Sequence, residues 1–333
     1  MAKAITSVDV ARRAGVSQTT VSRVFNAEAL VSKGTRARVL TAAQDLGYQP
    51  NVLARSLTTQ HSRLVGIVTQ VSNPFYASVI ERLNCQLQQL GRQTLLFSLE
   101  AEQEADEILP LIRQYRLEGV VITSAGLSSE MAGQCERLGI PVVLINRYVL
   151  GARVSAVCCD NVEGGRLAAN LLLDAGHKRL AHIAGRAHTS TNRDREKGFT
   201  DRLRERGYRL PLREASDHDY ASGREAANKL LRRPERPDAI FCVSDTVAFG
   251  AIDAARYDGG LRVPDDVSII GFDDLPAAAW PAYALTTIRA PVDRMIDRAL
   301  TLLLERIANP AAEPVLELLM GQLVKRGSAR LAG

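Results

Sequence analysis

The sequence predicts an α/β protein with two parts, a small all-helical N-terminal headpiece and a larger body of two doubly wound units. Three observations lead to this fold class. The net charge is confined to the first sixty residues, those residues have helix-turn-helix spacing, and the remainder alternates apolar strands with amphipathic helices. With 333 residues and 46% hydrophobic content, the chain is long enough to bury more than one core.

The charge distribution separates the two parts. The chain has 42 Lys and Arg against 37 Asp and Glu, a formal net charge of +5. Eight of these basic residues and three of the acidic ones lie within residues 1–60, which leaves 34 of each sign in the other 273 residues. Because positive charge attracts phosphate, we expect the first sixty residues to contact nucleic acid and the neutral body to bind something else.

Two features of the composition predict a cytoplasmic location. No apolar run reaches the roughly 18 residues needed to span a bilayer, and the N-terminus lacks the apolar core of a signal peptide. The five cysteines form no CxxC pair, so they are expected to be reduced core residues. They are Cys85, Cys135, Cys158, Cys159 and Cys242.

A helix-turn-helix is predicted near the N-terminus. Thr6 and Asp9 form a capping pattern for a helix over residues 7–14, which a glycine follows. Ser17 can cap a second helix over residues 18–25, and a three-residue turn then joins the two helices.

The second helix exposes a face suited to DNA, which carries Gln18, Thr19, Ser22 and Arg23. Arginine can bond two acceptors of guanine, glutamine can pair with adenine, and hydroxyl groups bond phosphate oxygens. For Gln18 or Thr19 taken alone, a merely solvated polar face is the alternative.

A third helix is predicted over residues 33–46, capped by Ser32. Its predicted buried stripe consists of Val39, Leu40, Ala43 and Leu46. A fourth helical segment over residues 52–57 is far shorter than the roughly 12–15 residues at which isolated helices become marginal, so it should fold only against a partner.

The runs ITSVDVARRAGVSQTTVSRVFN and VSKGTRARVLTAAQDLGYQPNVLARSL resemble the headpiece and hinge of the LacI/GalR family of bacterial transcriptional regulators. The resemblance is gapless over residues 5–57. Its Asp-Val-Ala, Ala-Gly-Val-Ser and Thr-Val-Ser-Arg-Val pieces are far more specific than a generic helix-turn-helix.

The resemblance implies which residues contact DNA. It places Gln18, Thr19 and Arg23 at the family's major-groove specificity positions. Contacts to the DNA backbone are implied for Thr6, Ser17, Thr20, Ser22, Asn26, Ser32 and Thr35. In the hinge, Leu57 occupies the position of a leucine that the family wedges into the minor groove, with Ala54 and Arg55 beside it. A linker residue packed onto the body is the alternative for Leu57.

The body is predicted as two series of strands and helices, which implies parallel sheets with right-handed crossovers. The first series has strands over 64–70, 94–99, 119–124 and 141–146 and helices over 75–90, 104–115 and 129–138. The second has strands over 179–185, 239–244 and 267–274 and helices over 164–175, 194–206, 222–232 and 246–257.

The body also resembles the same family's effector domain, which is similar to the periplasmic sugar-binding proteins. Segments such as SNPFYASVIERL, DNVEGGRLAANLLLDAGHKRLAHIAG and VPDDVSIIGFDD carry this likeness, and with the headpiece it covers residues 5 to about 327.

The resemblance implies a domain plan. It has a headpiece over 1–50, a hinge helix and linker over 51–62, and an effector-binding and dimerisation domain over 63–333. Within the last, an N-subdomain covers about 63–160 plus 290–327 and a C-subdomain about 161–289. The family's chain crosses between subdomains three times, so a helix over 292–308 and a closing strand over 315–325 should return to the first. No leucine heptads follow, and a dimer is expected.

An effector cleft is expected between the carboxyl ends of the two sheets. The resemblance places Phe75, Asn146, Arg195, Tyr220 and Asp273 at ligand positions. Such a set suits the hydroxyls of a sugar or the carboxylate of a sugar acid. Asp245 is expected to cap the helix that follows it. Other interpretations stay open for further residues: a rim salt bridge for Arg147, core for Trp280, and a turn only for Asp160 and Asn161.

The predicted function is a sequence-specific DNA-binding transcriptional regulator, most simply a repressor of a palindromic operator, switched by a sugar or sugar acid. An enzyme is not expected, because the chain has no GxGxxG after a strand, no GxxxxGK[ST], no HExxH and no GxSxG. No cofactor or metal is expected, and the histidines fall at no ligand spacing. The alternatives are a solute-binding protein, which would need a signal peptide, and a sugar-metabolising enzyme, which would turn over its ligand.

Overall fold

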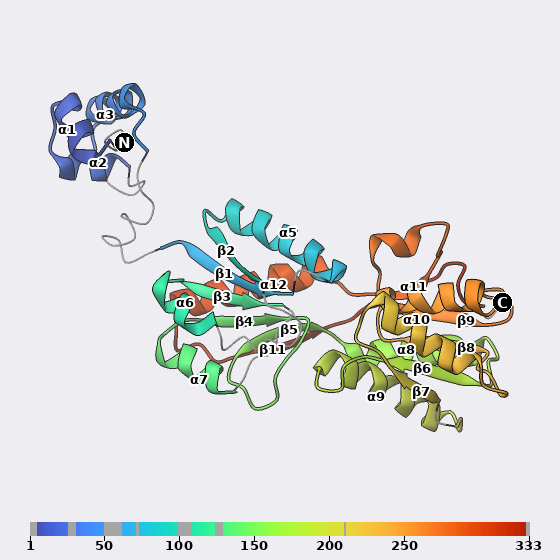
Figure 1. Ribbon diagram of the computed structural model, residues 1–333. Helices are drawn as coiled ribbons and strands as arrows, with labels where there is room; N and C mark the ends of the chain where they lie inside the picture. Colours follow the sequence, from blue (N-terminus) through green and yellow to red (C-terminus); the bar gives the residue numbers. More distant parts are fainter. Residues whose placement is uncertain are drawn as a thin grey trace. The chain divides into compact units, whose positions relative to one another are not determined.

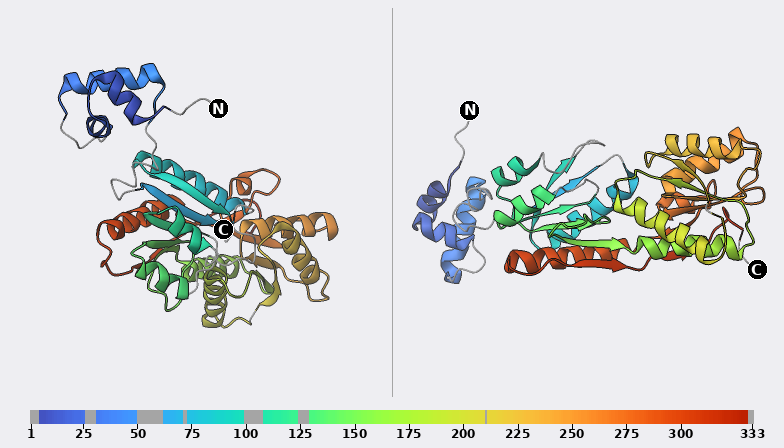
Figure 2. Two further views of the ribbon diagram at one scale, coloured as in Figure 1. Left: turned by 60° about the vertical axis from the view of Figure 1, so that its left-hand side comes forward. Right: turned by 90° about the horizontal axis from the view of Figure 1, so that it is seen from below.

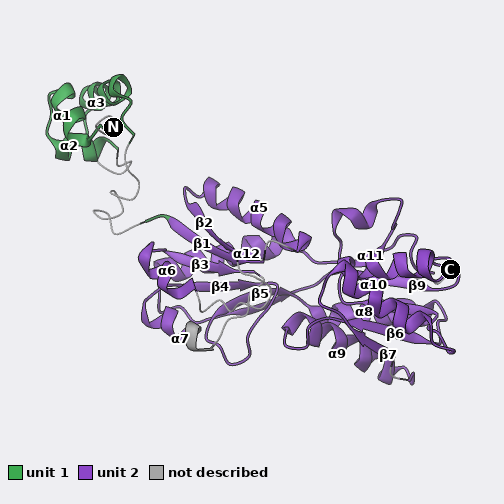
Figure 3. Cartoon of the chain, viewed as in Figure 1, with its two compact units in different colours: residues 1–63 green, residues 64–333 purple. Residues whose placement is uncertain are grey.

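The structure, a computed structural model, describes residues 5–25, 31–49, 62–70, 73–98, 108–123, 129–209 and 211–330. The chain divides into two compact units, Met1–Arg63 and Leu64–Gly333 (Figure 3). In the parts of the chain that are described, no helix has both the length and the apolar character needed to cross a membrane.

The described residues of the first unit contain three helices, α1 (Ser7–Ala14), α2 (Gln18–Val24) and α3 (Lys33–Leu46) (Figure 1). All three agree with the predicted bounds to within one residue. Each begins at a hydroxyl side chain that accepts a backbone N–H of the first turn, from Thr6, Ser17 and Ser32. Glycines with φ +63° end α1 and α3.

The core of this unit is small and tightly packed. Val10, Val21 and Val39 are at most 1% exposed, and alanines of α1 and α3 fill the space between them. Leu40 was predicted to be buried and is instead 44% exposed. The prediction was wrong because residues at i+3 and i+4 from Val39 share its face, and Leu40, the next residue, is turned about 100° away.

The first sheet of the second unit is all parallel and has the order β11-β5-β4-β3-β1-β2. Its strands are β1 (Leu64–Thr69), β2 (Gln93–Ser98), β3 (Gly119–Ile122), β4 (Val142–Ile145), β5 (Ser155–Cys159) and β11 (Leu316–Leu319). Helices α5 (Pro74–Gln89) and α12 (Val292–Ala308) cover one face of this sheet (Figure 2, α12 in red). Helices α6 (Leu109–Gln114) and α7 (Ser129–Arg137) pack on the opposite face. We call this assembly the first lobe.

The second sheet has the order β12-β10-β9-β8-β6-β7, with only β12 antiparallel. Its strands are β6 (Leu180–Ala184), β7 (Leu212–Ala215), β8 (Ala239–Cys242), β9 (Ser268–Asp273), β10 (Thr286–Arg289) and β12 (Gln322–Val324). Helix α8 (Asn161–Asp174) packs on α9 (Ser190–Glu205), and α10 (Tyr220–Leu231) packs on α11 (Asp245–Asp253). A π-helical stretch, Ala254–Asp258, continues α11. We call this assembly the second lobe.

Three strands were missing from the predicted series. No helix separates β4 from β5, so the strand–helix alternation passed over β5. The edge strand β7 alternates half-buried and exposed residues and lacks an apolar run. Residues 286–289, which form β10, were not predicted as a strand.

The chain passes between the lobes three times, as the resemblance implied, but its last crossing differs from the expectation. Residues 315–325 form two strands in different sheets, instead of one closing strand in the first. Gly321 separates them, where a Cβ would lie 2.9 Å from Ile288 and 3.1 Å from the Cys159 sulfur. The third crossing therefore packs directly against the other two, and residues after Gly321 belong to the second lobe.

Candidate DNA-binding face and effector cleft

Helix α2 presents the predicted reading face. Gln18, Thr19, Ser22 and Arg23 are exposed, whereas Val21 and Val24 on the opposite side are nearly inaccessible. Gln18 Nε2 donates a 3.0 Å hydrogen bond to Ser7 Oγ, which ties the start of α2 to α1. The face is therefore polar, accessible and carried by a helix whose apolar side is fixed in the core.

The predicted backbone-contacting hydroxyls cluster at helix N-termini. Thr6 Oγ1 donates to the Asp9 carboxylate at 2.7 Å, and Asp9 N–H returns a bond to Thr6 in a capping box. The hydroxyls of Ser17 and Thr20 lie 2.9 Å apart at the start of α2. Since N-terminal turns leave N–H groups without helical partners, such positions suit phosphate oxygens.

The third helix repeats this arrangement, with Ser32 Oγ donating to Thr35 Oγ1 at 2.9 Å. Asn26, Ala54, Arg55 and Leu57, the remaining predicted DNA contacts, lie outside the described residues, as do residues 52–57 of the predicted hinge helix. The described part of the site is thus the helix-turn-helix and the start of α3.

Two arginines that the sequence analysis did not assign fix the helices. Arg36 Nη1 donates to the Val24 carbonyl at 3.0 Å and so anchors the end of α2 to α3. Arg13 pairs with Asp45 at 3.3 Å and joins α1 to α3. Both contacts join residues far apart in the sequence, and an arginine in a helix does not by itself predict such a partner.

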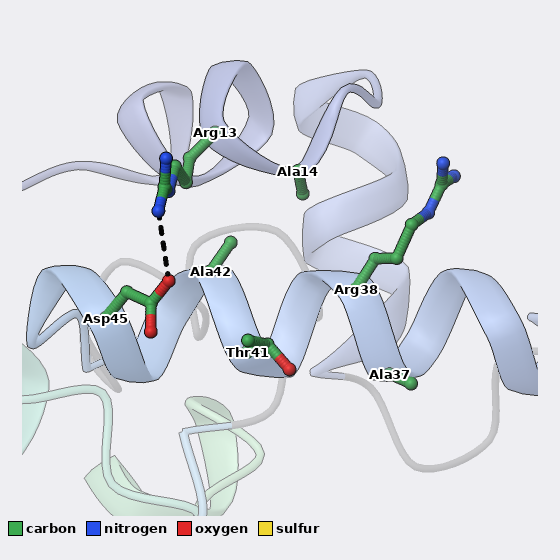
Figure 4. A pocket seen from close by; sticks show the side chains of 7 residues that line it. All are labelled: Arg13, Ala14, Ala37, Arg38, Thr41, Ala42 and Asp45. Atoms are coloured by element: carbon green, nitrogen blue, oxygen red, sulfur yellow. Dashed lines mark hydrogen bonds and ion pairs between the residues drawn. The ribbon is translucent and has the colours of Figure 1, made fainter.

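A shallow pocket of about 350 Å³ lies between α1 and α3 (Figure 4). It is lined by Arg13, Ala14, Ala37, Arg38, Thr41, Ala42 and Asp45. None of the predicted DNA-contacting residues lines it, and its polar groups include the Arg13–Asp45 pair that already joins the helices.

In the second lobe, Arg195 is the centre of a buried network. Its Nε donates to Asn161 Oδ1 at 2.8 Å, its Nη1 to the Val243 carbonyl at 2.5 Å, and its Nη2 to Asp273 Oδ1 at 3.1 Å. The guanidinium lies 3.6 Å from the centre of the Phe272 ring. The structure thus brings the predicted Arg195 and Asp273 together and adds Asn161.

Close helix packing positions this network. A Cβ on Gly165 of α8 would lie 2.2 Å from the Arg195 carbonyl oxygen. A Cβ on Gly198 of α9 would lie 1.9 Å from the Val162 carbonyl oxygen. Only glycine at both positions lets α8 and α9 approach closely enough for Asn161 to meet Arg195.

Asp245 does not cap α11, contrary to the interpretation from sequence. Ser244 accepts the Val247 N–H as the cap, and Asp245 is the first helical residue. The Asp245 carboxylate is fully buried, accepting from Thr287 Oγ1 at 2.5 Å and from Leu275 N–H at 2.7 Å.

Burial changes the acidity of two carboxyl groups here. Desolvation, with the charge of Asp273 nearby, raises the pKa of Asp245 to about 7. Desolvation also raises the pKa of Asp273 to about 6, although the Arg195 charge opposes it. Gly271 of β9 leaves room for Asp245, since a Cβ there would lie 2.3 Å from Asp245 Oδ1.

In the first lobe, Tyr76 links the two predicted cleft residues. Asn146 Nδ2 donates to the Tyr76 hydroxyl at 3.2 Å, and the Phe75 and Tyr76 rings meet edge to face with centres 5.2 Å apart. Phe75 and Asn146 are each 4% exposed. Tyr76 directly follows Phe75, yet nothing in the sequence pattern distinguished it.

Tyr148 connects the two lobes. Its backbone N–H donates to Ser190 Oγ at 3.1 Å, and its hydroxyl donates to Asp194 at 2.8 Å. Arg193 Nη2 in turn donates to the Tyr148 hydroxyl at 2.8 Å. Residues just after β4 thereby contact the first turn of α9.

The structure does not bring Tyr220 to this group. Its hydroxyl donates to Asp253 at 2.7 Å, in the contact between α10 and α11. None of the described contacts joins it to Phe75, Asn146, Arg195 or Asp273. Trp280 is 58% exposed and so is not core. Within the described ranges, no three His, Cys, Asp or Glu residues are arranged to hold a metal ion.

Comparison with known proteins covers both units. Residues 6–51 match the family described as bacterial regulatory proteins, lacI family, and residues 169–329 match the periplasmic binding protein-like domain. The chain is 34% identical to the HTH-type transcriptional repressor PurR of Yersinia pestis (strain Pestoides F) over 328 residues, which are 96% of this chain and 95% of that one.

Solved structures of similar proteins cover nearly all of this chain. A complex of the transcriptional regulator CelR with cellobiose is 31% identical, with a TM-score of 0.74 and coverage of 98% of this chain and 100% of that one. The lac repressor dimer bound to operator and the anti-inducer ONPF is 26% identical, with a TM-score of 0.88 and coverage of 98% and 99%.

Proposed function

The chain belongs to the lacI family of bacterial regulatory proteins, and from this premise we propose that it binds a palindromic operator in double-stranded DNA as a homodimer. It is a transcriptional regulator and not an enzyme. We further propose that it is a repressor that acts in the cytoplasm, at the nucleoid, and that a sugar or sugar acid in the cleft switches its operator affinity.

The observation that carries the DNA-binding proposal is the exposed face of α2. Its Arg23 and Gln18 project from a helix whose apolar side is buried, beside three N-termini with hydroxyl caps. This arrangement supports base reading in the major groove and phosphate contact around it. The similarity to a lac repressor dimer bound to operator supports the same geometry.

The proposed switch is allosteric. Ligand in the cleft moves one lobe against the other, and the dimer transmits this motion to the hinge residues Ala54, Arg55 and Leu57 in the minor groove. A cellobiose complex of a similar regulator supports a sugar-like ligand in the cleft. Because coupling is reciprocal, operator DNA must change effector affinity by the same factor.

Arg23→Ala tests the reading face. The variant is expected to lose about 1–3 kcal/mol at the specific operator with non-specific affinity nearly intact, because a bidentate base contact is lost. Arg12→Ala, on the exposed side of α1, is the matched control and should change both affinities alike. Fluorescence anisotropy on operator and scrambled duplexes measures both, and an equal loss on the two DNAs for Arg23→Ala would refute base reading.

The switch is tested separately by titrating effector into the protein with and without saturating operator. Identical effector affinities in the two titrations would exclude coupling, even if both ligands bind.

A further inference from the structure

We propose that the effector carries a negative charge bound by Arg147, and that Asn146 accepts a hydrogen bond from one of its hydroxyl groups. This inference rests on the proposed function, since it assigns a ligand class and a specificity-determining residue to the same cleft. The ligand class is a sugar or polyol that bears a carboxylate or a phosphate ester.

Asn146 and Arg147 leave β4 at its carboxyl end with two unmet hydrogen-bonding atoms. Asn146 Oδ1 and Arg147 Nε are buried, and neither has a partner among the described residues. Asn146 has φ +70°, a conformation that is uncommon outside glycine and turns the chain at this point. A buried hydrogen-bonding atom that has no partner costs free energy. These two atoms therefore indicate a ligand that offers a donor to Asn146 and an acceptor to Arg147.

The chemistry of the two atoms defines that ligand. Asn146 Nδ2 is already bonded to Tyr76, so the free Oδ1 can only accept, which suits a hydroxyl donor. Arg147 can only donate, and Nε with a terminal nitrogen forms the fork that matches two oxygens of a carboxylate or phosphate.

Cationic groups of both lobes act on His218 of the second lobe. Burial and the charges of Arg195, Arg147 and Arg186 together lower the pKa of His218 to about 3, with a further contribution from His188. The His218 ring lies against Gly185, where a Cβ would be 2.0 Å from its Nε2. Arg147 directly precedes Tyr148, whose bonds to Ser190 and Asp194 hold this end of β4 against the second lobe.

Two carboxylates of the second lobe, Asp273 and Asp194, are already engaged by protein groups. Asp273 pairs with Arg195 at 3.1 Å, and Asp194 pairs with Arg193 at 3.0 Å while accepting from Tyr148. In the described chain, no carboxylate lies within ion-pair distance of Arg147. A neutral sugar would leave this guanidinium without a counter-charge, whereas an anion supplies one.

The test is calorimetric titration of the full-length protein without DNA. The probes are D-gluconate and glucose 6-phosphate, each beside a neutral counterpart, D-sorbitol and D-glucose. At least one anion is expected to bind tenfold or more tightly than its counterpart, as a charge-assisted bond implies. The carboxylate and phosphate arms distinguish the two sources of charge.

Three variants of the loop between β4 and β5 separate the role of Arg147 from general charge. Arg147→Met should lower anion affinity at least tenfold and leave neutral-sugar affinity unchanged. Arg153→Met is the matched control, because Arg153 is exposed and paired with Glu313 at 3.2 Å, and it should bind anions like the wild type. Arg147→Lys keeps the positive charge but cannot donate two parallel hydrogen bonds. Its anion affinity should lie between those of Arg147→Met and the wild type.

The inference is overturned if no anion binds, if a neutral counterpart binds as tightly as its anion, or if Arg147→Met keeps anion affinity. Melting temperatures of the variants show whether they are folded. If Arg147→Met does not fold, the anion affinity of Arg147→Lys decides the question instead. Arg147-dependent anion binding without any change in operator affinity would defeat the proposed switch alone. A neutral sugar that changes operator affinity would defeat this inference alone.

Discussion

At the scale of single residues, the most informative group is the buried carboxyl of Asp245. A Ser-Asp-Thr run between a strand and a helix offers several good caps, and local rules do not choose among them. The choice is made by Thr287, far along the chain, whose hydroxyl reaches the Asp245 carboxylate. Single-residue roles that depend on such contacts, including those of Tyr76 and Asn161, could not be predicted from the sequence.

Asp245→Asn is expected to change the pH dependence of stability. Because the folded pKa of Asp245 is raised to about 7, its stabilising contribution is complete below about pH 4 and is lost as pH rises through 7. The full difference amounts to about 4 kcal/mol. Asparagine has the same shape and no charge to bury.

The melting temperature of Asp245→Asn relative to the wild type should therefore increase from about pH 5 to about pH 8. Scanning calorimetry across that range measures it. Parallel curves for the two proteins would show that Asp245 does not ionise in this window.

At the scale of elements, the predictions from sequence succeeded where local signals are strong. The bounds of α1 and α3 match because caps, glycine stops and apolar periodicity agree there. They failed at β5 and β7, where no helix intervenes or no apolar run exists. The exposed face of α2 depends on one local element and was predicted, whereas the buried contacts of Arg195 join distant elements and were predicted only in part.

Gly198→Ala is expected to destabilise the second lobe. The new Cβ would meet the Val162 carbonyl of α8, a backbone atom that cannot rotate away, so the helices must separate. Overpacking of this kind costs about 1–3 kcal/mol or more, and it moves Arg195 as well.

Gly133→Ala is the matched control, since the nearest atom to its Cβ would be the flexible Arg137 side chain at 3.4 Å. Thermal melts should show a loss of several degrees for Gly198→Ala and no loss for Gly133→Ala. Equal melting temperatures for the two variants would mean that α8 and α9 tolerate the change.

At the scale of the whole second unit, the lobes are joined by three chain crossings and by Tyr148. The crossings are covalent and meet at Gly321, whereas the contacts of Tyr148 with Ser190, Asp194 and Arg193 can break. Any motion of one lobe against the other must therefore pivot near Gly321 and open or close the Tyr148 contact.

Tyr148→Phe should loosen that contact while keeping the ring. Loss of the hydroxyl removes bonds to Asp194 and Arg193, and the local opening free energy falls by about 1 kcal/mol for each hydrogen bond. Hydrogen exchange in residues 146–150 and 189–195 should become several-fold faster. Tyr115→Phe, on an exposed part of the first lobe, is the control. Unchanged exchange in both segments would show that Tyr148 does not hold the lobes.

The interleaved order of the strands has a consequence for synthesis on the ribosome. Residues 5–49, which contain the three headpiece helices, emerge early and require nothing downstream, so the headpiece can fold while translation continues. Neither lobe can complete its sheet at that stage, because β11 and β12 are translated only after residue 315. A nascent chain therefore acquires its helix-turn-helix long before it completes either lobe.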